Sequence, residues 1–307
     1  MLNYRKNKKK IAFHRQYNQY SGGHQKVRDY LDHCMAYGQL DVSLWCESSS
    51  KVNANLFSDI PGITYQQSYA PQDADIVFLA GMDWKNYLPF YDEKQTKVNL
   101  IQHVRHGDKR HPLFQFLQFK AVRLCVSQAV YDAIIPYANG PCYVIKMGHE
   151  IPNIKLHRDI DVYVLATKQP SLGKQITTVL QQRGYHVVIH DEPTERSMVY
   201  QAMAAAKVTL ALPNKTEGFY LPGIEAMQLS GWAVIPDCIA SREYSSPGAN
   251  ITMCELSADS CLHAIEAATS AMQTWTYFLH KRAGVKRARE YKPQVERQTL
   301  YRVLDSL

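Results

Sequence analysis

Short runs of β-branched and apolar residues alternate with helical stretches along most of the chain, and this alternation limits the fold more than any other feature. Strand–helix–strand repetition implies a mostly parallel sheet that is covered by helices on both faces. In the first half, the predicted strands are Lys10–His14, Val42–Trp45, Asp75–Leu79, Val98–Gln102 and Arg123–Val126, and the predicted helices are His24–Tyr37, Phe114–Phe119 and Ala129–Tyr137. The class predicted is therefore α/β.

The same pattern starts again in the second half. Its predicted strands are Val162–Ala166, His186–His190, Val208–Leu212 and Trp232–Pro236, and its predicted helices are Leu172–Arg183, Thr194–Ala205 and Leu221–Ser230. Between the halves, the segment Gly148–Asp161 contains Pro152 and many polar residues, which is typical of a domain junction. With 307 residues the chain is long enough for two domains. We predict Rossmann-like domains at residues 1–152 and 153–284, with a C-terminal helix at 285–307 that packs back on the first domain.

Apolar runs and cysteines exclude several classes of protein. No apolar run reaches the roughly 18 to 20 residues that a membrane-spanning helix needs. The seven cysteines are odd in number, scattered and without a C-x-x-C pair, so neither a disulfide framework nor a zinc site is predicted. These features favour a cytoplasmic protein.

Positive charge is concentrated near the two ends of the chain, whose formal net charge is +7. Five of the six residues from Arg5 to Lys10 are basic, and a second group of basic residues extends from Lys281 to Arg302. Such groups bind anionic lipid headgroups, nucleic acid or acidic substrates, or simply keep the termini soluble. A position at the inner face of the membrane is one alternative that follows from them.

The strongest chemical signal is the segment Glu217-Gly-Phe-Tyr-Leu-Pro-Gly-Ile-Glu225, which follows a predicted buried strand and leads into a helix. Gly218 lets the backbone turn sharply, and Pro222 suits the first turn of a helix. Free N–H groups at a helix start attract phosphate. A carboxylate on each side accepts hydrogen bonds from sugar hydroxyls. The segment is therefore expected to hold a nucleotide-diphosphate sugar.

These residues resemble the Glu-x7-Glu region of retaining glycosyltransferases of the GT-B fold, and most closely those of glycosyltransferase family 4. The resemblance includes Ala226-Met227 and the strand that begins near Trp232. It implies two Rossmann-like domains facing each other across a cleft. It also implies that Glu217 contacts the donor sugar and that Glu225 binds the ribose hydroxyls. The backbone around Gly218, Phe219, Tyr220 and Leu221 would hold the diphosphate.

The same resemblance selects residues in the first half of the chain. Gly22 and Gly23 follow the first strand, where the family has a glycine-rich loop that approaches the donor phosphates. His103 directly follows another strand, where the family places a catalytic-site histidine that faces the donor sugar. The G-x-G-x-x-G fingerprint of dinucleotide-binding dehydrogenases is absent from this sequence.

The resemblance also implies positively charged side chains for the leaving diphosphate after the first strand of the second domain. Lys168 and Lys174 both lie there, and neither has the family spacing, so both are kept as candidates. Metal is not expected, because the pairs Asp73/Asp75 and Asp159/Asp161 precede strands, whereas a metal motif for a sugar nucleotide follows one. The nucleotide sugar is a co-substrate, and no cofactor is expected.

The acceptor and the oligomeric state stay open. A glycan or lipid-linked acceptor at an anionic membrane surface fits the basic ends. A modified base in DNA, as in viral enzymes, is the alternative acceptor, because basic residues also follow phosphates. A third hypothesis is a nucleotide-sugar binder of the same fold without catalytic activity.

Overall fold

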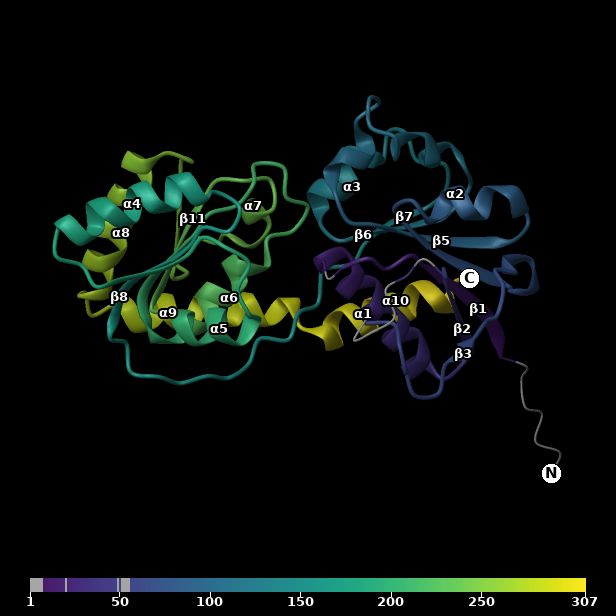
Figure 1. Ribbon diagram of the computed structural model, residues 1–307, viewed down its shortest axis with the longest axis horizontal. Helices are drawn as coiled ribbons and strands as arrows, with labels where there is room; N and C mark the ends of the chain where they lie inside the picture. Colours follow the sequence, from purple (N-terminus) through teal and green to yellow (C-terminus); the bar gives the residue numbers. More distant parts are fainter. Residues whose placement is uncertain (1–7, 20, 49, 51–55) are drawn as a thin grey trace. The chain divides into compact units, whose positions relative to one another are not determined.

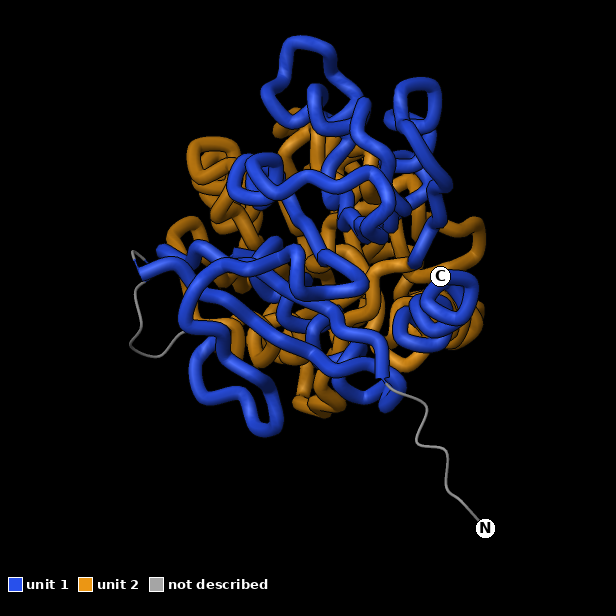
Figure 2. Tube along the Cα trace, turned by 90° about the vertical axis from the view of Figure 1, so that its right-hand side faces the viewer, with its two compact units in different colours: residues 1–145, 296–307 blue, residues 146–295 orange. Residues whose placement is uncertain are grey.

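The structure, a computed structural model, describes residues 8–19, 21–48, 50 and 56–307 of the chain. The described residues form two compact units, which Figure 2 colours separately. Unit 1 contains the chain up to Ile145 together with Glu296–Leu307, and unit 2 contains Lys146–Val295. Contacts therefore divide the chain after Ile145, whereas the sequence suggests a division after residue 152.

Unit 1 is built on a parallel sheet whose described strands have the order β3-β2-β1-β4-β5-β6-β7. These strands are β1 (Lys9–Arg15), β2 (Leu40–Cys46), β3 (Thr64–Tyr65), β4 (Ile76–Ala80), β5 (Thr96–Ile101), β6 (Val122–Cys125) and β7 (Cys142–Val144). The helices are α1 (Gly22–Tyr37), α2 (Asp83–Tyr87), α3 (Gln128–Ile134) and the 3-10 turns η1 (Pro71–Asp73), η2 (Leu88–Phe90), η3 (Val104–Gly107) and η4 (Phe114–Gln118). The strand order reverses between β1 and β4, as in Rossmann folds.

Local sequence explains where the main elements of unit 1 begin and end. All five residues of β4 are buried apolar side chains, as expected for a central strand of a parallel sheet. The Ser21 side chain accepts from His24 N at the start of α1, and Gly38 ends this helix in the left-handed conformation at φ 76°. Ser127 caps α3 in the same way as Ser21 caps α1.

The last helix, α10 (Pro293–Asp305), contributes a buried carboxylate to unit 1. Glu296 is 1% exposed, and its Oε2 lies 3.1 Å from Lys26 Nζ and 3.1 Å from His33 Nε2 on α1. Lys26 also pairs with Asp29 at 2.8 Å, so Glu296 is the second carboxylate at this buried ammonium. The final residues of the chain are therefore part of the core of unit 1.

Unit 2 contains a second parallel sheet, in the order β12-β11-β10-β8-β9 among the described strands. These are β8 (Ile160–Leu165), β9 (Val187–His190), β10 (Ala206–Ala211), β11 (Trp232–Pro236) and β12 (Ile251–Cys254). The helices are α4 (Pro170–Gln182), α5 (Arg196–Ala205), α6 (Leu221–Leu229), α7 (Ser241–Tyr244), α8 (Ala258–Met272), α9 (Tyr277–Ala288) and the 3-10 turn η5 (Arg289–Tyr291). Helices α4 and α8 cover one face of this sheet, and α5, α6 and α9 cover the other (Figure 1).

The predicted α/β class is confirmed, and the structure adds elements that the sequence pattern does not indicate. Strands β3, β7 and β12 are short and at most half buried, so they lack the apolar run that marks a buried strand. The prediction that Gly22 and Gly23 form a loop is wrong, because both belong to the first turn of α1. The predicted helix Thr194–Ala205 begins two residues later, at Arg196, and the Thr194 hydroxyl donates to Glu192 O.

No helix in the described part of the chain is long and apolar enough to span a lipid bilayer.

Lys281 of α9 caps the C-terminal end of α6. Its Nζ donates to the carbonyl oxygens of Met227, Gln228 and Ser230 at 2.9, 2.9 and 2.5 Å. We expect Lys281→Met to lower the free energy of unfolding by about 1 to 3 kcal/mol, because these carbonyls lose their donor. Urea unfolding measures this change. Lys286→Met, at an exposed position of the same helix, is the control and should change stability by less than about 0.5 kcal/mol.

Candidate functional site

The strand order of unit 2 reverses between β8 and β10, which are direct neighbours. In open parallel sheets, ligands bind beyond the carboxyl ends of the strands at such a reversal. Lys168 follows the end of β8, and Glu217 follows the end of β10. The sheet therefore carries a cation and a carboxylate to the place where a ligand is expected.

Lys168 and Glu217 form an ion pair. Lys168 Nζ donates to Glu217 Oε1 at 2.5 Å and lies 5.0 Å from the centroid of the Tyr220 ring. The side chain of Lys168 is 37% exposed and that of Glu217 is 16% exposed. Pairs this accessible contribute little to stability. Both groups are thus close enough to solvent to exchange this contact for one with a ligand.

Buried aromatic side chains hold the turn between Glu217 and Gly223 in place. The Phe219 ring packs against Tyr244 and Tyr291, with centroids 5.7 and 5.1 Å apart. The Tyr244 hydroxyl donates to the carbonyl of Tyr220 at 3.0 Å. The side chains of Phe219 and Tyr220 are buried, so the backbone is the part of this turn that a ligand can meet.

Gly223 is required by this packing. A Cβ added there would lie 2.0 Å from the Tyr244 hydroxyl oxygen and 2.4 Å from the neighbouring ring carbon. The Tyr244 side chain is completely buried, so its ring could move only by displacing its neighbours. The glycine therefore lets the start of α6 approach the tyrosine that holds the Glu217–Gly223 turn in place.

The start of α6 has the features of an anion-binding helix end. The Tyr220 side chain makes no capping hydrogen bond, and Pro222 lies in the first turn. Pro222 has no N–H and Gly223 N donates to the Tyr220 carbonyl at 3.2 Å, so the positive end of the helix dipole is what favours a negatively charged group here. Glu217 precedes this helix start, and Glu225 follows it by one turn.

Lys174 is placed differently from Lys168. It lies on α4, its side chain is 68% exposed, and its Nζ is 2.9 Å from Asp191 Oδ2, just after β9. The hydrogen bond from Lys174 and its charge hold the pKa of Asp191 below the ordinary value. Of the two candidate lysines, Lys168 is the one that contacts Glu217.

Glu225 lies at the centre of a buried hydrogen-bonded cluster. Its Oε1 is 2.7 Å from His149 Nε2 and 3.3 Å from the hydroxyl of Tyr200, and it also accepts from Arg196. These partners all meet Oε1, and none of the residues that the structure describes donates to Oε2. One oxygen is thus anchored by the protein, and the other remains available as an acceptor.

The environment keeps Glu225 ionised. Burial favours the neutral acid, but the hydrogen bond from His149 and the positive charge of Arg196 outweigh it. The pKa of Glu225 consequently lies below its ordinary value of 4.5. An ionised carboxylate is the stronger acceptor for a hydroxyl group.

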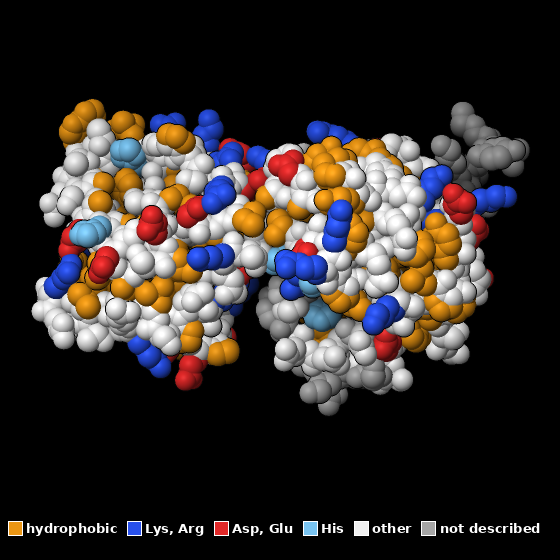
Figure 3. All heavy atoms as spheres, turned by 90° about the horizontal axis from the view of Figure 1, so that it is seen from above, with side chains coloured by type: hydrophobic (Ala, Val, Ile, Leu, Met, Phe, Trp, Pro, Cys, Tyr) orange, Lys and Arg blue, Asp and Glu red, His pale blue; other side chains and the backbone are white. Residues whose placement is uncertain are grey.

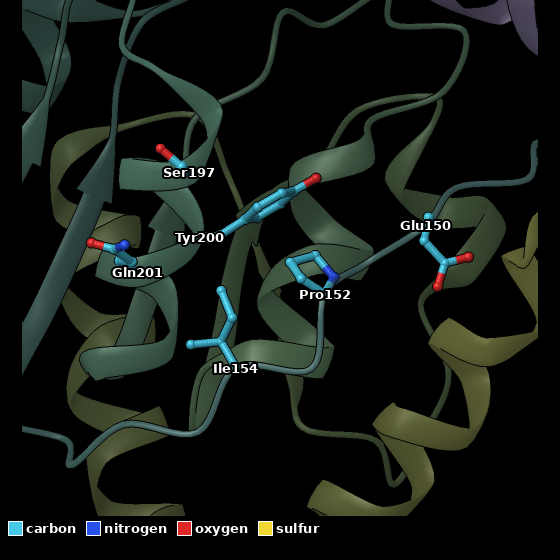
Figure 4. Close-up of a pocket in the computed structure, with 6 residues that line it drawn as sticks. All are labelled: Glu150, Pro152, Ile154, Ser197, Tyr200 and Gln201. Carbon is cyan, nitrogen blue, oxygen red and sulfur yellow. The ribbon is translucent and has the colours of Figure 1, made fainter.

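A hollow of about 460 Å³ opens beside this cluster. Figure 4 shows Ser197, Tyr200 and Gln201 projecting from α5, opposite Glu150, Pro152 and Ile154 of the segment that precedes β8. Tyr200 lines the hollow and also donates to Glu225. The hollow and the Glu225 cluster therefore share the side chain of Tyr200.

The candidates of unit 1 gather at the carboxyl ends of β1 and β5. Gln102 Nε2 donates to Gly23 O at 3.2 Å, and the next residue, His103, starts η3, with its Nδ1 accepting from Arg105 N. A Cβ added to Gly22 would meet nothing within 4 Å, and one added to Gly23 would reach Gln102 at 3.7 Å. Packing within the described protein therefore does not require either glycine.

Sequence reasoning missed the residues that anchor Glu225. His149 lies in the segment interpreted as a domain junction, and Arg196 and Tyr200 are four residues apart on α5. This spacing places both on one helix face, which is the only signal that the sequence offers. It also missed a buried cluster in unit 1, where Asp83 pairs with Arg15 and lies 3.2 Å from His14.

The Asp-x-Asp pairs have structural contacts at the amino ends of strands. Asp75 accepts from Lys10 N, and Asp161 accepts from His186 N and pairs with Lys207. In the described ranges, no three His, Cys, Asp or Glu side chains gather in a way that could hold a metal ion. That the chain works without a metal stays a prediction.

Comparison with solved structures identifies the class of fold. Sucrose-phosphate synthase from Thermosynechococcus elongatus matches with a TM-score of 0.70 and 12% identity, over 97% of this chain and all of that one. HepE from Anabaena, solved with UDP-glucose, matches with a TM-score of 0.68 and 14% identity over the same shares. A UDP-forming trehalose-phosphate synthase from Burkholderia vietnamiensis matches at 0.60 and 10%, over 98% and 100%.

The chain thus has the GT-B fold of glycosyltransferases, and the predicted fold is confirmed. Several of the similar structures contain UDP or UDP-glucose. No protein-family profile and no curated protein sequence matches the chain.

Proposed function

We propose that the chain is a glycosyltransferase that transfers a sugar from a nucleotide-diphosphate sugar, with retention of the anomeric configuration. One observation carries this proposal. The carboxylates of Glu217 and Glu225 flank the uncapped start of α6 at the strand reversal of unit 2, with Lys168 beside them. A sugar, a diphosphate and a ribose are the groups that match a carboxylate, a helix start and a second carboxylate in this order.

Each donor group has a partner in this proposal. The ribose hydroxyls donate to Oε2 of Glu225, whose Oε1 is anchored by His149 and Arg196. The diphosphate meets the backbone of the Glu217–Gly223 turn. Lys168 neutralises the charge that develops on the diphosphate as the anomeric bond breaks. Glu217 accepts a hydrogen bond from the sugar and so positions it.

Gly22, Gly23 and His103, which lie in unit 1, keep in this proposal the roles that the family resemblance implies. A glycine in a helix costs about 0.5 to 1 kcal/mol relative to alanine. Since the described part of unit 1 leaves room for a Cβ at both positions, close approach of a ligand to α1 would be a physical reason for the two glycines. His103 is assigned to the sugar side, as the family resemblance implies.

Uridine donors are the first to test, because structures of the same fold contain UDP and UDP-glucose. A thermal-shift panel of nucleoside diphosphates and their sugars identifies the base. Transfer is then assayed with glycan, lipid-linked and modified-DNA acceptors, and NMR of the product gives the anomeric configuration. Donor binding without transfer or donor hydrolysis would support a binder and contradict an enzyme. Full activity in excess EDTA is expected, because Lys168 and the helix start supply the positive charge.

We expect Glu225→Gln to weaken binding of the preferred nucleoside diphosphate by about 10- to 100-fold, since a hydrogen bond to a charged group is worth about 1.5 to 3 kcal/mol. Isothermal titration calorimetry measures the affinity. The control is Glu195→Gln, an exposed carboxylate at the start of α5 that should leave the affinity unchanged. Unchanged affinity in Glu225→Gln would remove the ribose role.

A further inference from the structure

Three large apolar side chains project into solvent where α9 begins. Trp275 is 79% exposed, Phe278 is 59% exposed and Leu279 is 47% exposed. Single exposed apolar residues are ordinary, but three within five positions concentrate apolar surface at one end of α9. We name these three residues the apolar tip.

Basic residues continue from the apolar tip along the exposed face of α9. Arg282 and Lys286 of α9 and Arg289, which caps its C-terminal end, are all exposed, and their spacing of three or four residues continues from Phe278. We name these three basic residues the basic stripe. The whole segment Gln273–Arg289 contains no acidic residue. Within this segment the apolar tip therefore lies next to charged side chains that are all basic.

The opposite side of α9 is committed to the fold. Gly284 is buried against Asn250, where an added Cβ would lie 1.7 Å from the amide oxygen. Lys281 is turned inward to the carbonyls of α6. The apolar tip therefore does not result from a helix that is loosely attached and exposes its buried side.

Other parts of the surface differ from this one. Figure 3 looks onto the face of unit 2 that carries α4 and α8, and there basic and acidic side chains are interspersed. Arg183 on that side pairs with Glu266, for example. Of the α4/α8 face and the α9 surface, it is the α9 surface that has charge of one sign beside aromatic and aliphatic side chains.

The apolar tip lies at the amino edge of the sheet, away from the proposed donor site. His280, next to Leu279, contacts the ring of Trp232 at the start of β11 and the carbonyl of Gly248, which precedes β12. Lys168 and Glu217 follow the carboxyl ends of β8 and β10. A partner at the tip therefore does not occupy the donor site.

We propose that the apolar tip and the basic stripe of α9 dock unit 2 onto an anionic lipid bilayer. Trp and Phe favour the membrane interface, Leu279 adds aliphatic surface to be buried among the acyl chains, and basic residues are attracted to anionic headgroups. Nucleic acid fits less well, because an aliphatic side chain at the tip has no base to stack on and no phosphate to bind. The proposal does not depend on the identity of the donor.

Vesicle co-sedimentation tests the proposal on the full chain. One set of vesicles is phosphatidylcholine alone, and the other contains about 30% phosphatidylglycerol. We expect binding to the anionic vesicles, and at least tenfold weaker binding for Arg282→Gln/Lys286→Gln/Arg289→Gln. Trp275→Ser/Phe278→Ser/Leu279→Ser should lose binding to a similar extent. The matched control is Lys85→Gln/Lys94→Gln/Lys109→Gln, which removes the same charge from exposed positions of unit 1 and should bind normally.

Tryptophan fluorescence provides an independent measurement. Trp84 and Trp232 are buried and Trp45 in unit 1 is partly buried, whereas Trp275 is 79% exposed, so Trp275 should contribute most to a change in emission on vesicle binding. We expect a blue shift with anionic vesicles, quenching by brominated lipid, and loss of both signals in Trp275→Phe with little loss of binding. Absence of vesicle binding, binding of duplex DNA alone, or an equal loss in the control variant would overturn the proposal.

The proposed donor site and the proposed membrane docking can be tested independently. Thermal shifts with nucleoside diphosphates report on the donor site, and both α9 variants should keep them. Vesicle binding without any nucleotide shift would contradict the proposed function and leave membrane docking intact. A thermal shift with nucleotide but no vesicle binding would contradict membrane docking and leave the proposed function intact.

Discussion

Glu217→Gln should lower the rate of sugar transfer by about two to three orders of magnitude while the protein stays folded and binds nucleoside diphosphate within about threefold of the original affinity. The carboxylate is replaced by an amide of the same shape, so only its charge and its acceptor strength change. Removal of one well-placed electrostatic partner of a transition state has effects of this size.

Stability should hardly change in this variant. The partner of Glu217 is Lys168, whose side chain is 37% exposed, and loss of such an accessible ion pair costs at most about 1 kcal/mol. Steady-state kinetics with saturating donor measures the transfer rate, and calorimetry measures nucleotide affinity. Glu192→Gln, an exposed carboxylate in the loop after β9, is the control and should retain full activity. Full activity in Glu217→Gln would contradict the assignment of Glu217 as a contact of the donor sugar.

Gly223→Ala should have the largest effect on the fold of unit 2. The new methyl group would lie 2.0 Å from the hydroxyl oxygen of Tyr244, so this ring must move and give up its hydrogen bond to the Tyr220 carbonyl. We expect the free energy of unfolding to fall by about 2 to 4 kcal/mol from overpacking and the lost hydrogen bond. Nucleotide binding should weaken as well, because the Glu217–Gly223 turn loses its support.

Gly22→Ala is the informative counterpart. The described structure leaves this position open, so alanine in the first turn of α1 should raise stability slightly, by up to about 1 kcal/mol. If the donor phosphates approach α1, the same change should lower donor affinity. Urea unfolding and calorimetry on both variants separate the two kinds of glycine. A fully stable Gly223→Ala would contradict the packing described here.

The sequence predicts the fold well wherever elements are buried and long. Strands such as β4 and β11 consist of uninterrupted buried apolar residues, and these are visible in the chain itself. The short strand β12 is half buried and pairs with β11 alone, so neighbouring strands decide its structure rather than its own residues.

The candidate site shows the same limit. Glu217 and Glu225 are recognisable because a turn, a helix start and a strand surround them in sequence. The partners of Glu225 come from elsewhere: His149 lies 76 residues before it and Arg196 lies 29 residues before it. Only the folded sheet brings these side chains to one carboxylate. The choice between Lys168 and Lys174 likewise needs the geometry, which shows Lys168 against Glu217 and Lys174 against Asp191.

The chain leaves unit 1 after Ile145 and returns to it at Glu296, which has a consequence for synthesis on the ribosome. Unit 2 is one continuous stretch and can fold as soon as it has emerged. Unit 1 must wait for the last residues, because Lys26 and His33 lack the carboxylate of Glu296 until then. Translation that stops shortly before residue 296 should therefore release a chain in which unit 2 is native and the larger sheet is unfinished, a substrate for chaperones and proteases.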